Sequence, residues 1–524
     1  MSGDQAEVID FLAGRAFAPP VERIDTHAAL VFLEGERAWK MKRAVAFSFL
    51  DFSTLGRRER ALRDELRLNR RTAPMLYRAV RPVTRETDGN LAVDGAGTPV
   101  EWLLEMRRFP GDALYSQLAG RGGLDRRRID ELAEVIADFH EQAESRPEEG
   151  GWAGMREVVE GNALDLAKLA GDVLPAGAVA AVDRASRAQL HRHRDLLERR
   201  RQGGKVRHCH GDLHLRNIVL LDDRPVLFDC IEFNESFACI DVLYDLAFLV
   251  MDLVERGLER QARMLLQRYV ERTGEDEGLG LLPLFIGARA AIRAKVEGFA
   301  ARMQQDAAER DTGCRQAETY LALARRALSP PPARLVAVGG RSGTGKSSLA
   351  AALAPEIGPL PGAVVVRSDV IRKRLFGRRP TERLPQEAYQ PEVSDRVFAE
   401  VADNARRLLA GGHAVIADGV YGRPEQREAI AAVAAAAGVP FDGLWLSAPE
   451  AVLEARVEAR RDDASDADVK VVRMQRSIDQ RSVDATAGWQ PVRAGRPLDE
   501  VAAEARRLLA QAWAGAGAGV VGTP

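Results

Sequence analysis

Three polar residues between positions 206 and 234 have the types and the spacing for chemistry on a phosphate group. Asp212 lies in the sequence His-Gly-Asp, Asn217 follows five positions later, and Asp229 ends an apolar run twelve positions after that. Phosphoryl transfer from ATP needs one carboxylate that orients the attacking hydroxyl and accepts its proton. It also needs an amide oxygen and a second carboxylate that hold Mg²⁺ against the phosphates. The spacing therefore predicts Asp212 as the catalytic base and Asn217 and Asp229 as metal ligands.

A second group of residues, near position 340, forms a loop suited to hold phosphates. The sequence Gly-Arg-Ser-Gly-Thr-Gly-Lys-Ser at 340–347 fits the pattern G-x-x-x-x-G-K-S in full. In this pattern backbone N–H groups and a helix N-terminus face the phosphates. We expect Lys346 to reach the β- and γ-phosphates as a catalytic residue and Ser347 to bind Mg²⁺. The predicted nucleotide-binding residues are Gly340, Ser342, Gly343, Thr344, Gly345, Lys346, Ser347 and Ser348.

The elements around the first group predict a small β-rich lobe followed by a larger helical lobe. Residues 26–108 read as strands and turns with one helix at 57–71. Residues 124–330 are mainly helical, and a strand-rich patch interrupts them at 206–233. This layout is typical of protein-kinase-like folds.

Two lysines of the small lobe could hold the ATP phosphates. Lys40 and Lys42 alternate along a predicted strand, so both side chains point to one face. The strand belongs to a predicted hairpin whose turn lies at 34–36. Lys40 is the preferred ligand because of its distance from this turn, and Lys42 is the alternative. Glu65, in the following helix, would position the lysine. We also expect backbone groups near 105–107 to pair with adenine.

The segment at 210–217, His-Gly-Asp-Leu-His-x-x-Asn, resembles the signature of the aminoglycoside phosphotransferase and choline kinase group. The resemblance covers roughly residues 20–325. It implies that the domain phosphorylates a hydroxyl of a small molecule, and that Asp241 and Asp245 support the catalytic loop. No Gly-rich loop precedes the first hairpin, which departs from the protein-kinase pattern.

The residues after the phosphate loop resemble small P-loop kinases of the gluconate-kinase-like, polynucleotide-kinase-like and zeta-toxin-like types. The sequence Val-Val-Val-Arg-Ser-Asp at 364–369 reads as a strand that ends in a carboxylate, with Arg372 soon after. The likeness implies that Asp369 is the base and that Arg372 holds an anionic group of the acceptor. The alternative interpretation is a helix-capping aspartate and a solvated basic turn.

Further candidates follow in the same domain. Asp418 ends another buried strand and would hold the Mg²⁺ water shell or the acceptor. Arg427 is a candidate ligand for an anion of the acceptor. By the same likeness Arg460, before an Asp-rich loop, would belong to a lid over ATP.

The composition is that of an ordinary globular protein. The chain has 524 residues, of which 46% are hydrophobic and 29% charged, with a formal net charge of -2, which argues against a protein built mainly to bind nucleic acid. The N-terminal ten residues lack a secretory signal, and stretches such as 238–250 are too short and too charged to span a bilayer. We therefore expect a cytoplasmic protein whose partners are small-molecule acceptors; the sequence leaves its oligomeric state open.

The four cysteines form no C-x-x-C pair, so neither a zinc ribbon nor a disulfide framework is indicated. His208, Cys209, His210 and His214 have the types of metal ligands. Their place in the catalytic segment makes the catalytic interpretation the better one.

A run of three prolines at 330–332 separates the two groups of residues, because proline neither continues a helix nor donates to a sheet ladder. The predicted fold class is an α+β protein-kinase-like, aminoglycoside-phosphotransferase-like bilobal domain followed by an α/β P-loop NTPase domain with a parallel sheet. The expected segments are 1–108 (small lobe), 109–328 (helical lobe with the catalytic loop), 329–333 (linker), 334–513 (P-loop kinase domain) and 514–524 (disordered tail).

The sequence thus predicts two ATP- and Mg²⁺-dependent kinase sites in one chain. The combination resembles a family described as bifunctional aminoglycoside phosphotransferase and ATP-binding proteins. One alternative makes the P-loop domain a regulatory module without an acceptor. Another is aminoglycoside resistance, which needs an acidic site for a polycationic drug, and for which Glu232 is the candidate acceptor ligand.

Overall fold

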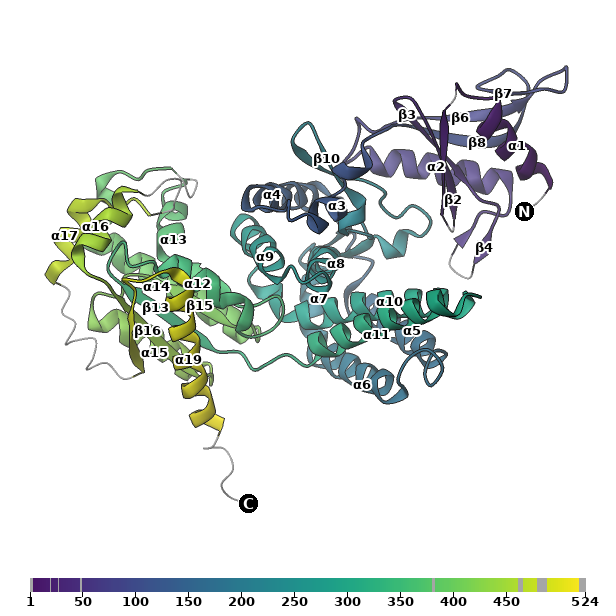
Figure 1. Cartoon of the computed structure of the whole chain (residues 1–524). Helices are drawn as coiled ribbons and strands as arrows, with labels where there is room; N and C mark the ends of the chain where they lie inside the picture. Colours follow the sequence, from purple (N-terminus) through teal and green to yellow (C-terminus); the bar gives the residue numbers. More distant parts are fainter. Residues whose placement is uncertain are drawn as a thin grey trace. The chain divides into compact units, whose positions relative to one another are not determined.

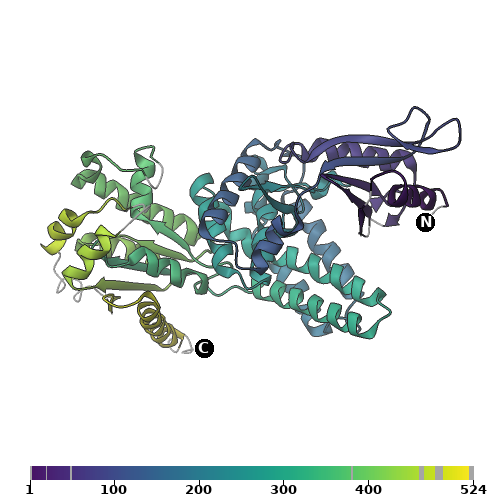
Figure 2. The ribbon, with the colours of Figure 1, turned by 45° about the horizontal axis from the view of Figure 1, so that its top comes forward.

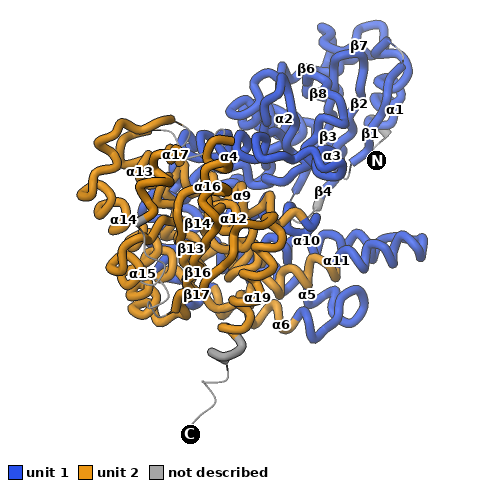
Figure 3. The backbone as a smooth tube through the Cα atoms, turned by 60° about the vertical axis from the view of Figure 1, so that its left-hand side comes forward, with its two compact units in different colours: residues 1–179, 190–257, 288–317 blue, residues 180–189, 258–287, 318–524 orange. Residues whose placement is uncertain are grey.

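The computed structural model divides into two compact units (Figure 3). Unit 1 comprises residues 1–179, 190–257 and 288–317, and unit 2 comprises residues 180–189, 258–287 and 318–524. Each unit is therefore built from segments that are distant in sequence. The structure describes residues 3–18, 20–26, 28–47, 50–378, 382–459, 465–477 and 488–517.

Unit 1 begins with a six-stranded antiparallel sheet in the order β1-β2-β3-β8-β6-β7 (Figure 1). The expected hairpin forms, with Leu33 opposite Ala38. Neighbouring residues of β3 pack on opposite faces of the sheet. Trp39 packs with α1 on one face, and Ala38 packs with Leu62 of α2 on the other. These elements are α1 (Gly3–Gly14), β1 (Val21–Asp25), β2 (Ala29–Glu34), β3 (Arg37–Lys42), β4 (Ala46–Phe47), β5 (Leu50–Asp51), α2 (Leu55–Asn69), β6 (Tyr77–Arg85), β7 (Leu91–Val93) and β8 (Thr98–Arg107).

A mainly helical segment follows the sheet in sequence (Figure 2). Two short antiparallel strand pairs interrupt it, β10 with β11 and β9 with β12, and the catalytic segment lies between their strands. The elements are η1 (Gly111–Ala113), α3 (Tyr115–Gly120), α4 (Arg126–Gln142), α5 (Gly151–Ala167), α6 (Ala176–Arg192), α7 (Arg194–Gln202), β9 (Val206–His208), η2 (Leu215–Asn217), β10 (Ile218–Leu221), β11 (Arg224–Leu227), η3 (Glu235–Phe237), β12 (Cys239–Asp241), α8 (Val242–Glu255), α9 (Glu259–Thr273), η4 (Glu277–Leu281), α10 (Leu282–Met303) and α11 (Ala307–Leu328).

Unit 2 contains a sheet of five parallel strands in the order β14-β15-β13-β16-β17. On one face, Val336 and Val338 of β13 pack with apolar residues of α12 and α19, and helices α13, α14 and α15 pack together elsewhere in the unit. The elements are β13 (Leu335–Gly340), α12 (Lys346–Leu353), η5 (Ala354–Glu356), β14 (Val364–Arg367), α13 (Ser368–Leu375), η6 (Gln386–Tyr389), α14 (Pro391–Ala410), β15 (Val415–Asp418), α15 (Pro424–Ala436), β16 (Phe441–Ser447), α16 (Glu450–Glu458), α17 (Val469–Met474), η7 (Gln475–Ser477), β17 (Trp489–Arg493) and α19 (Leu498–Gly517).

The edge strand of this sheet is covered by a glutamine from α9. The side-chain nitrogen of Gln267 donates to the Val365 carbonyl at 2.9 Å, and the Val365 N–H donates back to the Gln267 oxygen at 2.9 Å. An amide side chain thus takes the place of a neighbouring strand. Because unpaired strand edges invite association, this contact also protects the edge.

The fold class is as predicted, an antiparallel sheet with a helical lobe and then a parallel α/β sheet, whereas some of the expected segment limits differ from the structure. Unit 2 includes residues 258–287, which the sequence placed in the helical lobe. Helix α19 continues to Gly517, past the expected start of the tail at 514, because alanines among the last residues favour the helix. The remainder of the expected tail, 518–524, lies outside the described residues. Within the described part of the chain, each helix is either too short or too polar to cross a membrane.

We expect Gln267→Ala to lower the free energy of unfolding of unit 2 by roughly 1–3 kcal/mol, because the backbone of Val365 loses two partners at a partly buried edge. Chemical denaturation followed by tryptophan fluorescence measures the change. The control is Gln202→Ala, at an exposed position at the end of α7, which should leave the transition unchanged. Identical transitions for the two variants would show that water replaces the Gln267 amide at no cost.

Candidate active sites

The catalytic segment of unit 1 brings Asp212, Asn217 and Asp229 together. The side-chain nitrogen of Asn217 donates to Asp212 Oδ2 at 2.9 Å and to the Asp212 carbonyl at 3.0 Å. The same nitrogen lies 3.5 Å from the Asp229 carbonyl oxygen. Because the amide nitrogen faces Asp212, the amide oxygen of Asn217 is left for a metal ion.

Asp245, the supporting residue expected on α8, holds the backbone next to Asp212. Its carboxylate accepts hydrogen bonds from the N–H groups of His210 at 3.0 Å and Gly211 at 2.9 Å. It also lies 3.1 Å from His140 Nε2, and its side chain is fully buried. Gly211 has φ +82°, and a Cβ there would lie 3.0 Å from a backbone oxygen of the following loop. A glycine is thus required directly before the candidate base.

Asp241, the second expected supporting residue, fixes the start of the same helix. Its carboxylate forms a buried bidentate pair with Arg200, at 2.7 and 2.8 Å, and accepts from the Leu243 N–H at 2.8 Å. A capping carboxylate at this position satisfies an N–H group of the first helical turn. Asp241 therefore positions α8, on which Asp245 lies.

Asp229 has a backbone conformation that non-glycine residues rarely adopt, with φ +59°. Two side chains of the small lobe stabilise it. The Asp229 N–H donates to the Tyr77 hydroxyl oxygen at 3.1 Å, and the Cys230 N–H donates to Asn69 Oδ1 at 2.9 Å. The sequence carried no signal for Tyr77 or Asn69, because their partners lie more than 150 positions away.

Lys40 and Lys42 share one face of β3, and Glu65 binds both. Lys40 Nζ lies 2.7 Å from Glu65 Oε1 and 2.7 Å from Asp229 Oδ1. Lys42 Nζ lies 2.6 Å from Glu65 Oε2 and 2.5 Å from Glu232 Oε1. Lys40 pairs with Asp229 and Lys42 with Glu232, which supports the preference for Lys40 as the phosphate ligand.

Glu232 was expected to bind an acceptor, and the structure gives it another partner. Its side chain is 8% exposed and pairs with Lys42. Burial raises the pKa of Glu232 above its ordinary value, although the charge of Lys42 opposes this shift. The carboxylate is thus occupied inside the protein, because its charge could be buried only next to a cation. The acceptor role of Glu232 stays a prediction.

The charges around Asp212 keep it ionised. Burial would raise the pKa of Asp212, but the charge and hydrogen bond of His214, whose Nε2 lies 3.3 Å from Asp212 Oδ2, together with the charges of His210 and Arg289 lower that pKa well below the usual range. Burial lowers the pKa of His214, and the charge of Asp212 prevails and raises it. For Lys40, burial is likewise outweighed by Asp229 and Glu65, which raise its pKa.

The backbone at 105–107, expected to pair with adenine, lies at the end of a strand, and that pairing stays a prediction. These residues end β8, which lies between β3 and β6 in the sheet. The N–H of Arg107 donates to the Leu76 carbonyl at 2.8 Å, and Met106 pairs with residues of both neighbouring strands. The sequence predicted the strand but not that it would be flanked on both sides.

In unit 2 the loop between β13 and α12 has the backbone shape of a phosphate cradle. Gly340, Gly343 and Gly345 have φ of +138°, +84° and +89°. A Cβ at Gly340 or Gly343 would lie 2.5 or 2.7 Å from a backbone oxygen, so glycine is required at both positions. Lys346 is the first residue of α12, and its Nζ donates to the Arg341 carbonyl at 3.2 Å.

Gln475, which the sequence did not single out, contacts this loop from η7. Its Oε1 accepts from the Ser342 N–H at 2.7 Å. Arg456, on α16, donates to the Ala494 carbonyl at 2.9 Å and lies 3.5 Å from the Thr344 carbonyl. Side chains from distant segments thus hold the loop in place.

Ser347 and Asp418 meet at the carboxyl ends of the parallel strands. The Ser347 hydroxyl donates to Asp418 Oδ2 at 2.5 Å. Arg367, the last residue of β14, joins them: its Nη2 lies 3.2 Å from Ser347 Oγ, and its Nε lies 3.5 Å from Asp418 Oδ2. Arg367 was not singled out from the sequence, although it ends the apolar run that predicts this strand.

Asp369 lies in the first turn of α13 and not at the end of a strand as expected, because β14 already ends at Arg367. A negative charge in a first helical turn is favoured by the helix dipole. Burial raises the pKa of Asp369, and the nearby charge of Asp418 raises it further, while Lys346 and Arg367 oppose the shift. A carboxylate with a raised pKa is a candidate general base.

The two arginines expected to bind the acceptor differ in their surroundings. Arg372 is 8% exposed, donates to the Ala388 carbonyl at 2.6 Å and lies over the ring of Tyr389 at 5.1 Å. Arg427 is fully buried and donates to the Tyr421 carbonyl at 2.9 Å. The side chain of Arg427 points from α15 into the protein interior. In this structure it therefore does not reach an anion from solvent. The sequence showed its type but not its burial.

Arg460, the expected lid arginine, lies outside the described residues. In the described segment 465–477, Asp466 contacts other parts of the unit. Its carboxylate accepts from Lys373 Nζ at 2.7 Å, the Tyr389 hydroxyl at 2.7 Å and the Leu384 N–H at 3.0 Å. Asp466 thus ties this segment to α13 and η6, next to Arg372.

The donor atoms at both sites fit Mg²⁺, which prefers hard oxygen ligands. Unit 1 offers the amide oxygen of Asn217 and the carboxylate of Asp229, which is 40% exposed. Unit 2 offers the hydroxyl of Ser347 and the carboxylate of Asp418.

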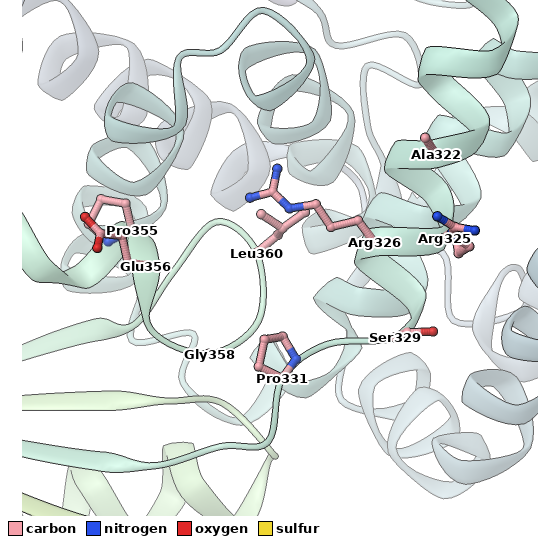
Figure 4. A pocket seen from close by; sticks show the side chains of 9 residues that line it. All are labelled: Ala322, Arg325, Arg326, Ser329, Pro331, Pro355, Glu356, Gly358 and Leu360. Carbon is pink, nitrogen blue, oxygen red and sulfur yellow. The ribbon is translucent and has the colours of Figure 1, made fainter. Parts of the chain in front are cut away.

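A cavity of about 500 Å³ in unit 2 belongs to neither group (Figure 4). It lies between the end of α11, the linker at Pro331 and the loop after α12. Arg325 and Arg326 contribute positive charge, whereas Glu356 is paired with Arg506 at 2.7 Å. None of the lining residues is a predicted site residue.

The two sites and the two folds define the class of the protein. A Lys–Glu–Asp network beside a His-Gly-Asp loop, and a glycine loop followed by a Ser–Asp pair, are the parts that kinases use to hold nucleotide phosphates. Residues 32–281 match the model of the phosphotransferase enzyme family, and residues 335–480 match the model of an AAA domain.

The chain belongs to a family of two-domain kinases in which a phosphotransferase domain precedes a P-loop domain. A relative, the uncharacterized protein Rv2004c of Mycobacterium tuberculosis, is 31% identical over 460 residues, which cover 86% of this chain and 89% of the relative. The uncharacterized protein Mb2027c of Mycobacterium bovis matches to the same extent.

Two solved structures are similar to parts of the chain. A choline/ethanolamine kinase family protein from Mesorhizobium loti is 15% identical, with a TM-score of 0.37, and covers 62% of this chain and 99% of that chain. A gluconokinase from Sinorhizobium meliloti 1021 is 23% identical, with a TM-score of 0.25, and covers 34% of this chain and 93% of that chain. Similarities at these TM-scores identify no acceptor.

We expect Asp212→Asn to lower the pKa of His214, because burial then acts on the imidazole without the charge of Asp212. NMR titration of the protein with labelled histidine rings measures the shift, and His214→Gln assigns the signal. The internal control is His413 in unit 2, whose pKa burial lowers to about 4 against the hydrogen bond to Gly362, and which should not move. An unchanged His214 titration would contradict the ion pair with Asp212.

Proposed function

We propose that the chain holds two ATP- and Mg²⁺-dependent phosphotransferase sites, one in each unit. In unit 1 the acceptor is a hydroxyl of a small molecule such as a sugar, an amino sugar or an amino alcohol. In unit 2 it is a second small molecule or a nucleotide-like compound. The observation that supports both is the same: a cation and a pair of oxygen ligands meet beside a carboxylate that can serve as base.

In unit 1, Asp212 would orient the acceptor hydroxyl and accept its proton. Asn217 and Asp229 would hold Mg²⁺, which would neutralise charge on the phosphates when bound. Lys40, fixed by Glu65, would bind the phosphates of ATP. The left-handed backbone of Asp229, held by Tyr77, directs this carboxylate toward Lys40 and so preorganises the site.

In unit 2, the glycine loop and Lys346 would bind the β- and γ-phosphates, with Ser347 and Asp418 on the side of the metal. Asp369 would accept the proton of the acceptor, because its raised pKa favours proton uptake. Arg372 would hold an anionic group of the acceptor. Its neighbours Tyr389 and Ala388 orient the guanidinium. Since both reactions use ATP, we further propose that the protein acts in the cytoplasm.

Two alternatives are less well supported. The first is aminoglycoside resistance, which needs an acidic site for a polycationic drug. The negative charge of Glu232 is neutralised by Lys42. A purely regulatory P-loop domain would not need a base, whereas the surroundings of Asp369 raise its pKa as a base requires. Under the regulatory alternative, Asp369→Asn would leave total phosphorylation unchanged.

We expect the full chain to bind two molecules of a non-hydrolysable ATP analogue in the presence of Mg²⁺. Lys346→Ala should remove one binding event and Lys40→Ala the other, because each variant deletes the phosphate ligand of a single site. Isothermal titration measures the stoichiometry. Lys168→Ala, at a lysine that is 60% exposed, is the matched control and should still bind two. A single event in the unmodified chain would refute the two-site proposal.

We expect Asp212→Asn to retain both binding events and to lose the activity of unit 1 by roughly 10²–10⁴-fold, the usual contribution of a general base. A screen of ATP consumption by the full chain against sugars, amino sugars, aminoglycosides and nucleosides would identify the acceptors. Asp212→Asn and Lys346→Ala serve as blanks for the two sites. An acceptor whose turnover survives Asp212→Asn and disappears in Lys346→Ala belongs to unit 2.

A further inference from the structure

Arg367 places a guanidinium at the oxygens that the P-loop site offers to a metal ion. Its Nη2 lies 3.2 Å from Ser347 Oγ, and its Nε lies 3.5 Å from Asp418 Oδ2. The side chains of Arg367 and Asp418 are 17% and 5% exposed. The interaction is therefore screened less by water and salt than a surface pair.

The register of the sheet imposes this contact. Arg367 and Asp418 are direct partners in the parallel pairing of β14 with β15, and each is the last residue of its strand. Two residues earlier in β14, Val365 is held from outside by Gln267. The strand that carries Arg367 is thus fixed on both sides, so the guanidinium is built into the site.

The charges explain why a cation is needed there. The side chain of Asp418 is only 5% exposed. A carboxylate buried in this way is stabilised by a positive charge close to it. Without a metal ion, Arg367 supplies that charge at Asp418.

The guanidinium of Arg367 occupies an acceptor position of the Ser347 hydroxyl, so it competes with a divalent ion for that oxygen. Mg²⁺ binds oxygen at about 2.0–2.1 Å and accepts little distortion. The hydroxyl of Ser347 already donates to Asp418 and lies within hydrogen-bonding distance of Arg367. Like charges only a few ångströms apart also repel strongly in a partly buried site.

We propose that Arg367 is a built-in counter-ion of the P-loop site, which holds Ser347 and Asp418 in place before nucleotide binds and which Mg²⁺ must displace. This inference rests on the proposed function of unit 2. Arg367 is a positioning residue in this role, and it sets how much Mg²⁺ the site needs to bind nucleotide. It also keeps the free metal ion out of the site until the phosphates add their own negative charge.

The test measures binding without turnover. The full chain is titrated with a non-hydrolysable ATP analogue over a range of Mg²⁺ concentrations, and the binding that Lys346→Ala removes is assigned to unit 2. Arg367→Gln should lower the Mg²⁺ concentration for half-maximal binding by roughly tenfold, because a like charge near the metal position is removed. Arg367→Lys should give a smaller shift, since its ammonium is a point charge without the fork of a guanidinium. Arg374→Gln, at an exposed ion pair with Glu400, should give none.

A second readout needs no nucleotide. Mg²⁺ alone should raise the thermal transition of unit 2 in Arg367→Gln and not in the unmodified protein, and Arg367→Lys provides the same test where Arg367→Gln does not fold. An unchanged Mg²⁺ requirement, or weaker nucleotide binding at every Mg²⁺ concentration, would overturn the counter-ion role. If Lys346→Ala removes no binding, the proposed function of unit 2 fails instead, so the two failures are distinguishable.

Discussion

A buried carboxylate needs a positive charge within a few ångströms, and both candidate sites are organised around that requirement. A phosphate site collects acids that bind metal and accept protons, yet these acids repel one another before metal and substrate arrive. In unit 1 the balancing charges are Lys40 and Lys42, which share Glu65. In unit 2 they are Lys346 and Arg367. The positions of the acids follow from where these cations are held.

The two units solve the same problem with different backbones. In unit 1 the carboxylate of Asp229 is directed by its own left-handed backbone, which long-range hydrogen bonds to Tyr77 and Asn69 stabilise. In unit 2 the strain lies in glycines, which adopt positive φ at little cost. In the first, distant segments stabilise the strained residue itself, whereas in the second the glycines supply the conformation and distant side chains contact the loop. Substitutions in the small lobe that break these contacts should therefore shift Asp229 even where no site residue is changed.

This difference also explains which features could be predicted from sequence. The groups at 210–229 and 340–347 were found because their function depends on local spacing, and the alternation of Lys40 and Lys42 correctly placed both on one face. The acceptor roles of Glu232 and Arg427 rested on residue type alone, and type does not reveal burial. Tyr77 and Gln267 were missed because their partners are far away in sequence. Arg367 could have been found, since it ends the apolar run of a predicted strand whose carboxyl end lies at the edge that carries the site.

The proline linker illustrates the same limit at the scale of domains. Three prolines mark a break in secondary structure, and from sequence the P-loop domain was expected to begin directly after them, at position 334. The structure gives the parallel sheet an edge strand whose outer hydrogen bonds are satisfied by Gln267, more than 60 positions before the prolines. It also places Gly280 so close to Gly411 that a Cβ would lie 2.1 Å from a backbone oxygen. Both contacts join a segment before the prolines to one after them. Without the earlier segment, the edge of the parallel sheet would be unpaired and exposed. The linker therefore separates two stretches of sequence, while the compact unit that holds the P-loop site begins well before it.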